Sequence, residues 1–221
     1  ADDTYGLYET VEGKFYENAG TGYFYGIGTI YDEWLPSSVT EWGQIYNYTQ
    51  QVVGSTYEIT ITGFKNEYAS LQQFVIPEVI NNIPVVEIKA SAFNNKTSII
   101  YVVIQDNSHL RTIGDYAFNG CKNMAHFSFG KIPNLTYLGN SAFSGCTLLN
   151  EDLKVPGTLS FCGQNVFNGT AITGIELNLS DDVDNNINLT NAFNACKKLV
   201  HAKITGHVDH MNYTFYNCTA L

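Results

Sequence analysis

The sequence has few charged residues, and those it has are mostly acidic. Only 14% of its 221 residues are charged, and eleven Lys and Arg residues face twenty-one Asp and Glu residues, for a net charge of −10. An acidic surface repels the phosphates of nucleic acids and the head groups of anionic lipids. We therefore expect neither a nucleic acid nor a membrane surface as a partner.

The sequence also lacks long hydrophobic runs and the common motifs of catalysis. No stretch of about 18 apolar residues could span a bilayer. There is no basic-then-apolar leader, and the chain opens with ADDTYG, as a mature or trimmed protein does, which is compatible with export. Nucleophile elbows, phosphate-binding loops and dinucleotide fingerprints are missing. We therefore expect a protein that is not an enzyme and that uses no cofactor.

A short phrase is repeated along most of the chain. The segment AFNGCKNM, which begins at Ala117, returns in related forms with its phenylalanines 25, 25, 24, 26 and 22 residues apart. A period of about 20 to 29 residues is typical of leucine-rich repeats. We predict that each coil adds one strand to a parallel sheet and that neighbouring coils stack their phenylalanines. These phenylalanines are Phe93, Phe118, Phe143, Phe167, Phe193 and Phe215.

The segment VVIQDNSHLRTIGDYAFNGCKNM, residues 102–124, resembles the repeat of the BspA-like leucine-rich repeat family. The resemblance covers about residues 57–221 and implies a repeat solenoid of about six coils with a parallel β-sheet. Residues 178–189 depart from the pattern because no Ile-Gly pair precedes Phe193, so we expect an irregular coil there. The chain stops at Leu221 without a polar cap, so we expect one module of a longer protein.

Residues 1–56 differ from the repeats in being acidic and rich in aromatic residues, including both tryptophans. Short strands between glycine turns predict either an N-terminal cap of the solenoid or a small β-subdomain. Exposed aromatic rings in this segment could stack on sugars, as in a carbohydrate-binding accessory module of a larger secreted polysaccharide-degrading protein. The competing interpretation is that these rings fill a small core or cover the open end of the solenoid. The candidate stacking residues are Trp34, Trp42, Tyr23 and Tyr25.

Cysteines and histidines are the remaining candidates for chemistry. Because four cysteines share one repeat position and Cys162 replaces an apolar residue, we predict buried free thiols, with a disulfide between stacked neighbours as the alternative. No C-x-x-C pair supports a metal site. The HVDH segment, residues 207–210, and the DDVDNNIN segment, residues 181–188, are interpreted as solvated loops, so no metal is predicted.

The residues that alternate with the apolar positions of each predicted strand should point away from the core. They mix apolar, aromatic and charged groups, which suits recognition of another macromolecule. The resemblance implies a non-enzymatic module that is secreted or at the cell surface and adheres to host or cell-surface macromolecules, so we expect an extracellular protein or glycan as ligand. The candidate binding residues are Ile100, Tyr101, Val103, His126, Glu151, Lys154, Glu176, His201 and Lys203.

Overall fold

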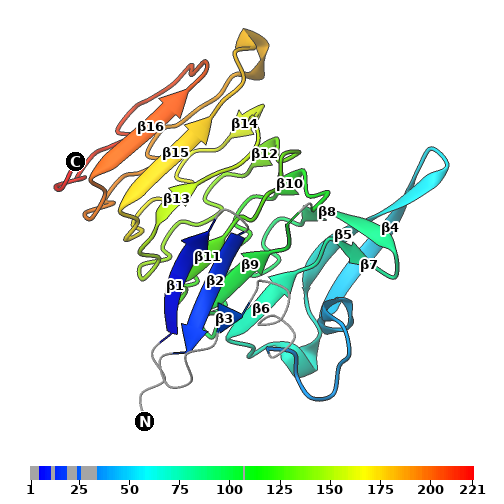
Figure 1. Ribbon diagram of the computed structural model, residues 1–221. Helices are drawn as coiled ribbons and strands as arrows, with labels where there is room; N and C mark the ends of the chain where they lie inside the picture. The colour runs from blue at the N-terminus through cyan, green and yellow to red at the C-terminus, as the bar shows by residue number, and fades with distance from the viewer. Residues whose placement is uncertain (1–4, 11–12, 19–23, 26–33, 107) are drawn as a thin grey trace.

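The computed structural model describes residues 5–10, 13–18, 24–25, 34–106 and 108–221, and it shows a solenoid of stacked coils (Figure 1). The coils follow one another in chain order from the cyan N-terminal hairpin to the red C-terminal coil. The expected fold of about six coils with parallel strands is confirmed. A separate antiparallel sheet precedes the solenoid and is formed by β1 (Tyr5–Thr10), β2 (Gly13–Asn18) and β3 (Phe24–Tyr25).

One face of the solenoid is made by the longer strand of each coil, and we call it the long-strand face. Its parallel ladder is interrupted once, between the third and the fourth of these strands. Burial alternates along β11 and β13, whereas the last three residues of β6 and of β9 are all buried. The strands are β6 (Gln73–Ile76), β9 (Tyr101–Ile104) and β11 (His126–Ser128), followed by β13 (Asp152–Lys154), β15 (Gly174–Asn178) and β16 (His201–Thr205).

A second parallel sheet, the short-strand face, runs through the Ile-Gly positions of the repeat. The expectation of one strand per coil is therefore wrong, because most coils have a second strand. This second strand can be as short as two residues and still pair with the coils on either side. An antiparallel hairpin starts this sheet, and β5 then pairs in parallel with β8. The strands are β4 (Tyr46–Val53), β5 (Thr56–Phe64), β8 (Ile83–Ile88), β10 (Thr112–Ile113), β12 (Tyr137–Leu138) and β14 (Phe161–Cys162), with β7 (Val79–Ile80) paired to β8.

The AF phrase closes the third side of each coil. Its N–H groups donate to carbonyl groups of the next coil, for example from Phe93 to Ala117 and from Phe118 to Ala142, each over 2.8 Å. The residues two before and two after each phenylalanine have a left-handed backbone, with φ at 68° for Gly120. Glycine adopts this conformation without the strain that a Cβ atom causes. The turn therefore favours the glycine of AFNG, although Asn95, Ala195 and Asn217 adopt the same conformation in other coils.

Stacked phenylalanines fill the centre of the solenoid. Phe118, Phe143 and Phe167 have no exposed surface, and their successive ring centroids lie 5.4 and 5.2 Å apart with nearly parallel planes. Offset stacking of this kind stabilises aromatic pairs beyond the burial of their area. Each coil thus depends on its neighbours to bury its ring, as the repeat pattern predicts.

The first coil is covered by residues that precede the repeats. The short 3-10 helix η1 (Trp42–Ile45) leads into β4, and Ile45 and Tyr46 are fully buried in the same hydrophobic core as the phenylalanines. The Tyr46 ring lies 6.3 Å from that of Phe93. The segment from Trp42 onward is therefore continuous with the repeats in both core and sheet, and the expected boundary between residues 56 and 57 falls inside β5. Another 3-10 helix, η2 (Asn66–Tyr68), follows β5.

The irregular coil expected at residues 178–189 is present. A 3-10 helix, η3 (Val183–Asn185), and two isolated bridges take the place of the two-residue strand. Asp182 caps η3, since its carboxylate accepts a hydrogen bond from the N–H of Asp184 over 3.0 Å. This segment is the DDVDNNIN loop, and its caps are those of an Asx turn.

Candidate binding face

The N-terminal part of the long-strand face carries aromatic rings. Tyr101 and His126 are paired in register on β9 and β11, and their rings stack 4.3 Å apart at 10°. Trp34 adds a third ring, 6.0 Å from Tyr101. Burial, together with the negative charge of Glu151, raises the pKa of the Tyr101 hydroxyl, so the ring stays neutral. We call Trp34, Tyr101 and His126 the aromatic patch.

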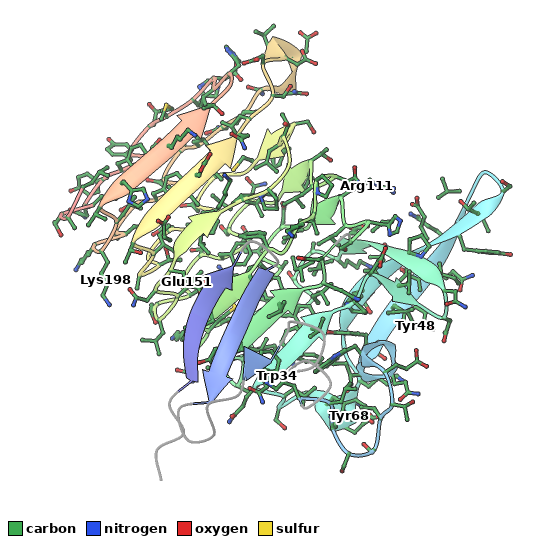
Figure 2. All side chains as sticks on the ribbon, in the orientation of Figure 1. Trp34, Tyr48, Tyr68, Arg111, Glu151 and Lys198 are labelled. Carbon is green, nitrogen blue, oxygen red and sulfur yellow. The ribbon has the colours of Figure 1, made fainter. Side chains whose placement is uncertain are left out.

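The break in the long-strand sheet is bridged by a side chain. The repeat gains one residue before β13, so Glu151 no longer occupies a strand position. One of its carboxylate oxygens lies 2.8 Å from Nδ1 of His126, and the other accepts a hydrogen bond from the N–H of Phe127 over 3.4 Å. Glu151 thus connects the aromatic patch to the C-terminal half of the face, where Figure 2 labels it.

Charged side chains dominate the C-terminal half. Lys154, Glu176 and Lys203 are paired in register on β13, β15 and β16. The Glu176 carboxylate lies 2.9 Å from Nζ of Lys203 and 3.4 Å from Nζ of Lys154. The hydrogen bond from Lys203 is the main reason that the pKa of the Glu176 carboxyl lies below its ordinary value. We call these three residues the charged row.

A second pair crosses the same strands closer to their beginnings. Nε2 of His201 lies 3.2 Å from Oδ1 of Asp152, and Gly174 occupies the register position between them. A Cβ atom on Gly174 would lie 2.3 Å from each of these two atoms. The absence of a side chain at this position therefore lets the pair meet across β15.

The expected outward face is only partly available to a ligand. Tyr101 is half-buried, and Lys154, His201 and Lys203 are exposed. The prediction that Val103 belongs to the binding face is wrong. Val103 is 3% exposed and lies in register beside Val75, which is also buried. Both valines belong to the hydrophobic cluster against which Trp34 packs, so Val103 offers no surface. Ile100 is half-buried, and its N–H donates to the carbonyl of Gln72.

The aromatic residues expected to stack on sugars are not assembled into an exposed platform. Trp42 is 8% exposed and is part of the core, so its role as a stacking residue must be corrected. Trp34 is half-buried against the same core. Tyr25 lies in β3, but its side chain is outside the described part of the structure, as is Tyr23. The core interpretation holds for Trp42, because the residue is buried in the same hydrophobic core as the repeats.

The cysteines are free thiols, as predicted, and all are buried except the half-buried Cys218. Burial raises the pKa of both Cys121 and Cys162 to about 12, so neither forms an appreciable thiolate at neutral pH. His207 lies 3.2 Å from Asp209 within the HVDH segment. Among the described residues, no group of three or more His, Cys, Asp or Glu side chains could hold a metal ion.

Sequence reasoning missed the short-strand face as a surface. Arg111, labelled in Figure 2, precedes β10 and forms a two-point ion pair with Glu58 of β5, over 2.7 and 3.0 Å. The partners are 53 residues apart, and only the second sheet brings them together. The recurrent Ile-Gly pair was the available signal, since it marks a second recurring backbone position in each coil.

A solenoid with two parallel sheets and an AF turn in every coil is the architecture of a leucine-rich repeat protein. The sequence pattern described as "BspA type Leucine rich repeat region (6 copies)" matches residues 57–187 and, in a second alignment, residues 86–221. These matches span well over half of the chain, so the chain belongs to the BspA-type leucine-rich repeat family. No curated protein sequence matches it.

A solved structure of a leucine-rich repeat protein shows the same fold. The leucine-rich repeat protein of T. pallidum, TpLRR, is 22% identical, with a TM-score of 0.56 over 80% of this chain and 88% of its own. A leucine-rich repeat protein from Bacteroides capillosus is 24% identical, with a TM-score of 0.46 over 60% of this chain and 94% of its own. No helix in the described residues is long and apolar enough to cross a membrane.

Proposed function

We propose that this protein is a non-enzymatic adhesion module, secreted or displayed at a cell surface, that binds an extracellular macromolecule through its long-strand face. One observation carries the proposal: the aromatic patch and the charged row both lie on the long-strand face, and Glu151, next to β13, contacts the aromatic patch across the break. Interface centres are enriched in large, rigid aromatic side chains, and charged groups around them set orientation. Repeat proteins of this class use such sheet faces to bind other proteins.

The face gains its order from contacts within the protein. Tyr101 is held between Trp34 and His126, so its ring loses little freedom when a partner covers it. Glu176 holds Lys154 and Lys203 in place in the same way. A partner with a matching apolar patch and alternating charges would therefore meet a preorganised surface.

The experiment measures binding to immobilised extracellular-matrix proteins and to whole cells by surface plasmon resonance and adhesion assays. Tyr101→Ser and the double variant Lys154→Glu/Lys203→Glu should each weaken binding about tenfold or more, as expected for residues at the centre of an interface. Lys198→Glu is the matched control, since Lys198 is exposed in a turn outside the face. Equal binding by all of these folded variants, or no binding by the wild type, would overturn the proposal.

The carbohydrate-binding alternative based on residues of the N-terminal segment receives no support from the described residues. Its stacking role would require Trp42 to be exposed, and that ring is buried. A glycan array that compares the wild type with Trp34→Ala tests whether Trp34 stacks on a sugar. Glycan binding that this substitution abolishes, without loss of folding, would revive it.

A further inference from the structure

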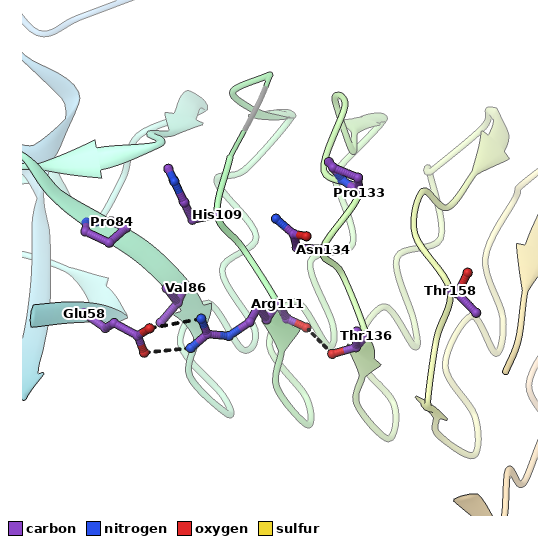
Figure 3. Close-up of a pocket in the computed structure, with 9 residues that line it drawn as sticks. All are labelled: Glu58, Pro84, Val86, His109, Arg111, Pro133, Asn134, Thr136 and Thr158. Atoms are coloured by element: carbon purple, nitrogen blue, oxygen red, sulfur yellow. Dashed lines mark hydrogen bonds and ion pairs between the residues drawn. The ribbon is translucent and has the colours of Figure 1, made fainter. Parts of the chain in front are cut away.

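The short-strand face contains a groove that the proposed adhesion surface does not use. The groove has a volume of about 550 Å³ and crosses the coils of β8, β10, β12 and β14 (Figure 3). Binding sites for small ligands commonly have volumes of about 300–1,000 Å³. The groove is therefore large enough for a ligand, and it is separate from the aromatic patch and the charged row.

Its walls are built from equivalent positions in successive coils. Pro84, His109, Asn134 and Thr158 form one row, each from a different coil (Figure 3). Because neighbouring strands lie about 4.8 Å apart, a row across four coils is about 14 Å long. This shape suits a chain-like ligand that lies along the axis of the solenoid.

The charges of the groove neutralise one another. Glu58 and Arg111 stand on either side of β8, and Figure 3 shows their ion pair passing Val86, which is buried. His109 lies 3.5 Å from the carboxylate of Glu78. An ionic ligand would have to break the pair of Glu58 with Arg111, and the net charge of −10 opposes an anionic ligand further. The groove therefore favours an uncharged ligand.

The groove is lined both by polar side chains that make no hydrogen bond to a described residue and by proline rings. The Asn134 amide and the Thr158 hydroxyl are exposed and make no side-chain hydrogen bond to any described residue. Two of the five N–H donors of Arg111 bind Glu58, which leaves others for a ligand. Pro84 and Pro133 supply apolar ring surface. Hydroxyl groups that alternate with C–H surfaces are the chemistry of a sugar chain.

An extended peptide fits the groove less well. Peptides that bind to β-sheets usually add a strand to a free edge. Strands β8, β10 and β12 each have a strand partner on both sides, so over most of the groove a peptide finds no free edge, and only β14 at its end has one. Recognition there must come from side chains alone.

We propose that this groove binds a short stretch of an uncharged oligosaccharide, with Asn134 and Arg111 donating hydrogen bonds to sugar hydroxyls and Pro84 and Pro133 contacting the C–H faces of the rings. The site is distinct from the aromatic positions Trp34 and Trp42 considered for sugar stacking. This proposal does not depend on the proposed function of the long-strand face, so either proposal can be overturned while the other stands.

The test uses the full chain, labelled with ¹⁵N, and titrates it with cellohexaose, laminarihexaose, maltohexaose and a mannan-derived tetrasaccharide, after a screen on a glycan array. Heparin and sialic-acid oligomers are the charged probes, and a library of extended peptides is the third arm. At least one uncharged glycan should bind and shift the amide resonances of residues 109, 134 and 158. Asn134→Ala should weaken that binding about tenfold, the value of one lost hydrogen bond of about 1.4 kcal/mol.

Asn150→Ala is the matched control, because Asn150 is also exposed but lies at the break of the long-strand face, and it should leave glycan binding unchanged. The proposal is overturned if no uncharged glycan binds, if only charged glycans or peptides bind, or if Asn134→Ala and Asn150→Ala behave alike. If Asn134→Ala fails to fold, glycan binding by Thr158→Ala tests the same site, and unchanged binding by this variant would overturn the proposal.

Discussion

The thiol of Cys196 donates a hydrogen bond to the carbonyl oxygen of Phe167, one coil earlier, over 3.1 Å. Cys121, Cys146 and Cys218 make the same bond to the phenylalanine of their preceding coil, over 3.2, 3.2 and 3.0 Å. A small buried residue with one donor therefore completes the hydrogen bonding of a buried carbonyl. This hydrogen bond gives a structural reason for cysteine at this position of the repeat.

The thiols should react unequally with alkylating agents. Burial raises the pKa of Cys196 to about 11 and that of Cys121 to about 12, whereas Cys218 is only half-buried. Because the thiolate is the reactive form, iodoacetamide at pH 8 should label Cys218 first and the other four only after unfolding. Mass spectrometry of tryptic peptides measures the order. Labelling of Cys121 as fast as of Cys218 in the native protein would contradict the buried arrangement.

The left-handed position after each phenylalanine predicts a reciprocal pair of substitutions. Ala195 has a φ of 60° where three other coils have glycine, for example Gly169 at 70°. Since a Cβ atom in this conformation costs about 1 kcal/mol, Ala195→Gly should raise the free energy of unfolding by about that amount. Gly169→Ala should lower it similarly, because a Cβ atom there would meet no other atom within 4 Å and only the backbone is strained.

Urea unfolding of both variants measures these changes. The explanation fails if the two substitutions shift stability in the same direction. A null result for Ala195→Gly alone would mean that the added freedom of glycine in the unfolded chain offsets the relieved strain.

The phenylalanine stack should be more sensitive in its middle than at its end. Phe143 is fully buried between Phe118 and Phe167, whereas Phe215, in the last coil, is half-buried and stacks on Phe193. Phe143→Ala should therefore cost about 3–5 kcal/mol. Phe215→Ala should cost about 1–2 kcal/mol, since it leaves a smaller apolar area unpaired. Thermal unfolding followed by circular dichroism ranks the two, and equal losses would show that the stack is not the main core.

The sequence predicted the features that recur with the period of the repeat. The phenylalanine stack, the buried cysteines and the parallel strands follow from it, because each coil repeats the same local pattern. Strands of two residues, such as Thr112–Ile113, were missed since they are too short to show alternation. The short-strand face could therefore be recognised only in the structure.

The candidate sites were harder to predict because they depend on contacts between distant residues. Alternation places Val103 outward, but the side chain is buried, in register beside Val75 of the preceding coil. The extra residue before β13 is visible in the sequence pattern. The contact of Glu151 with His126 is not, because it depends on the conformation of the Glu151 side chain. The pairing of Glu58 with Arg111 follows from the stacking of coils, and no local pattern encodes it.

That ion pair predicts a pH dependence of stability. The hydrogen bond from Arg111 is the largest influence on the Glu58 carboxyl and holds its pKa below the ordinary value, although burial opposes it. Since the pKa is lower in the folded state, the stabilisation is fully present above the unfolded pKa of about 4.3 and is lost as the pH falls through the folded pKa. Glu58→Gln should therefore destabilise the protein at neutral pH and lose this effect in acid.

We expect Glu58→Gln to cost about 0.5 kcal/mol at pH 7, as exposed ion pairs do, because Arg111 is half in solvent. The difference from the wild type should shrink between about pH 5 and about pH 3. Urea unfolding across this range measures it, with Glu67→Gln as the control because no ion pair to Glu67 is found among the described residues. Because the amide keeps the shape of the carboxylate but not its charge, a cost that stays constant down to pH 3 would contradict the ion-pair explanation.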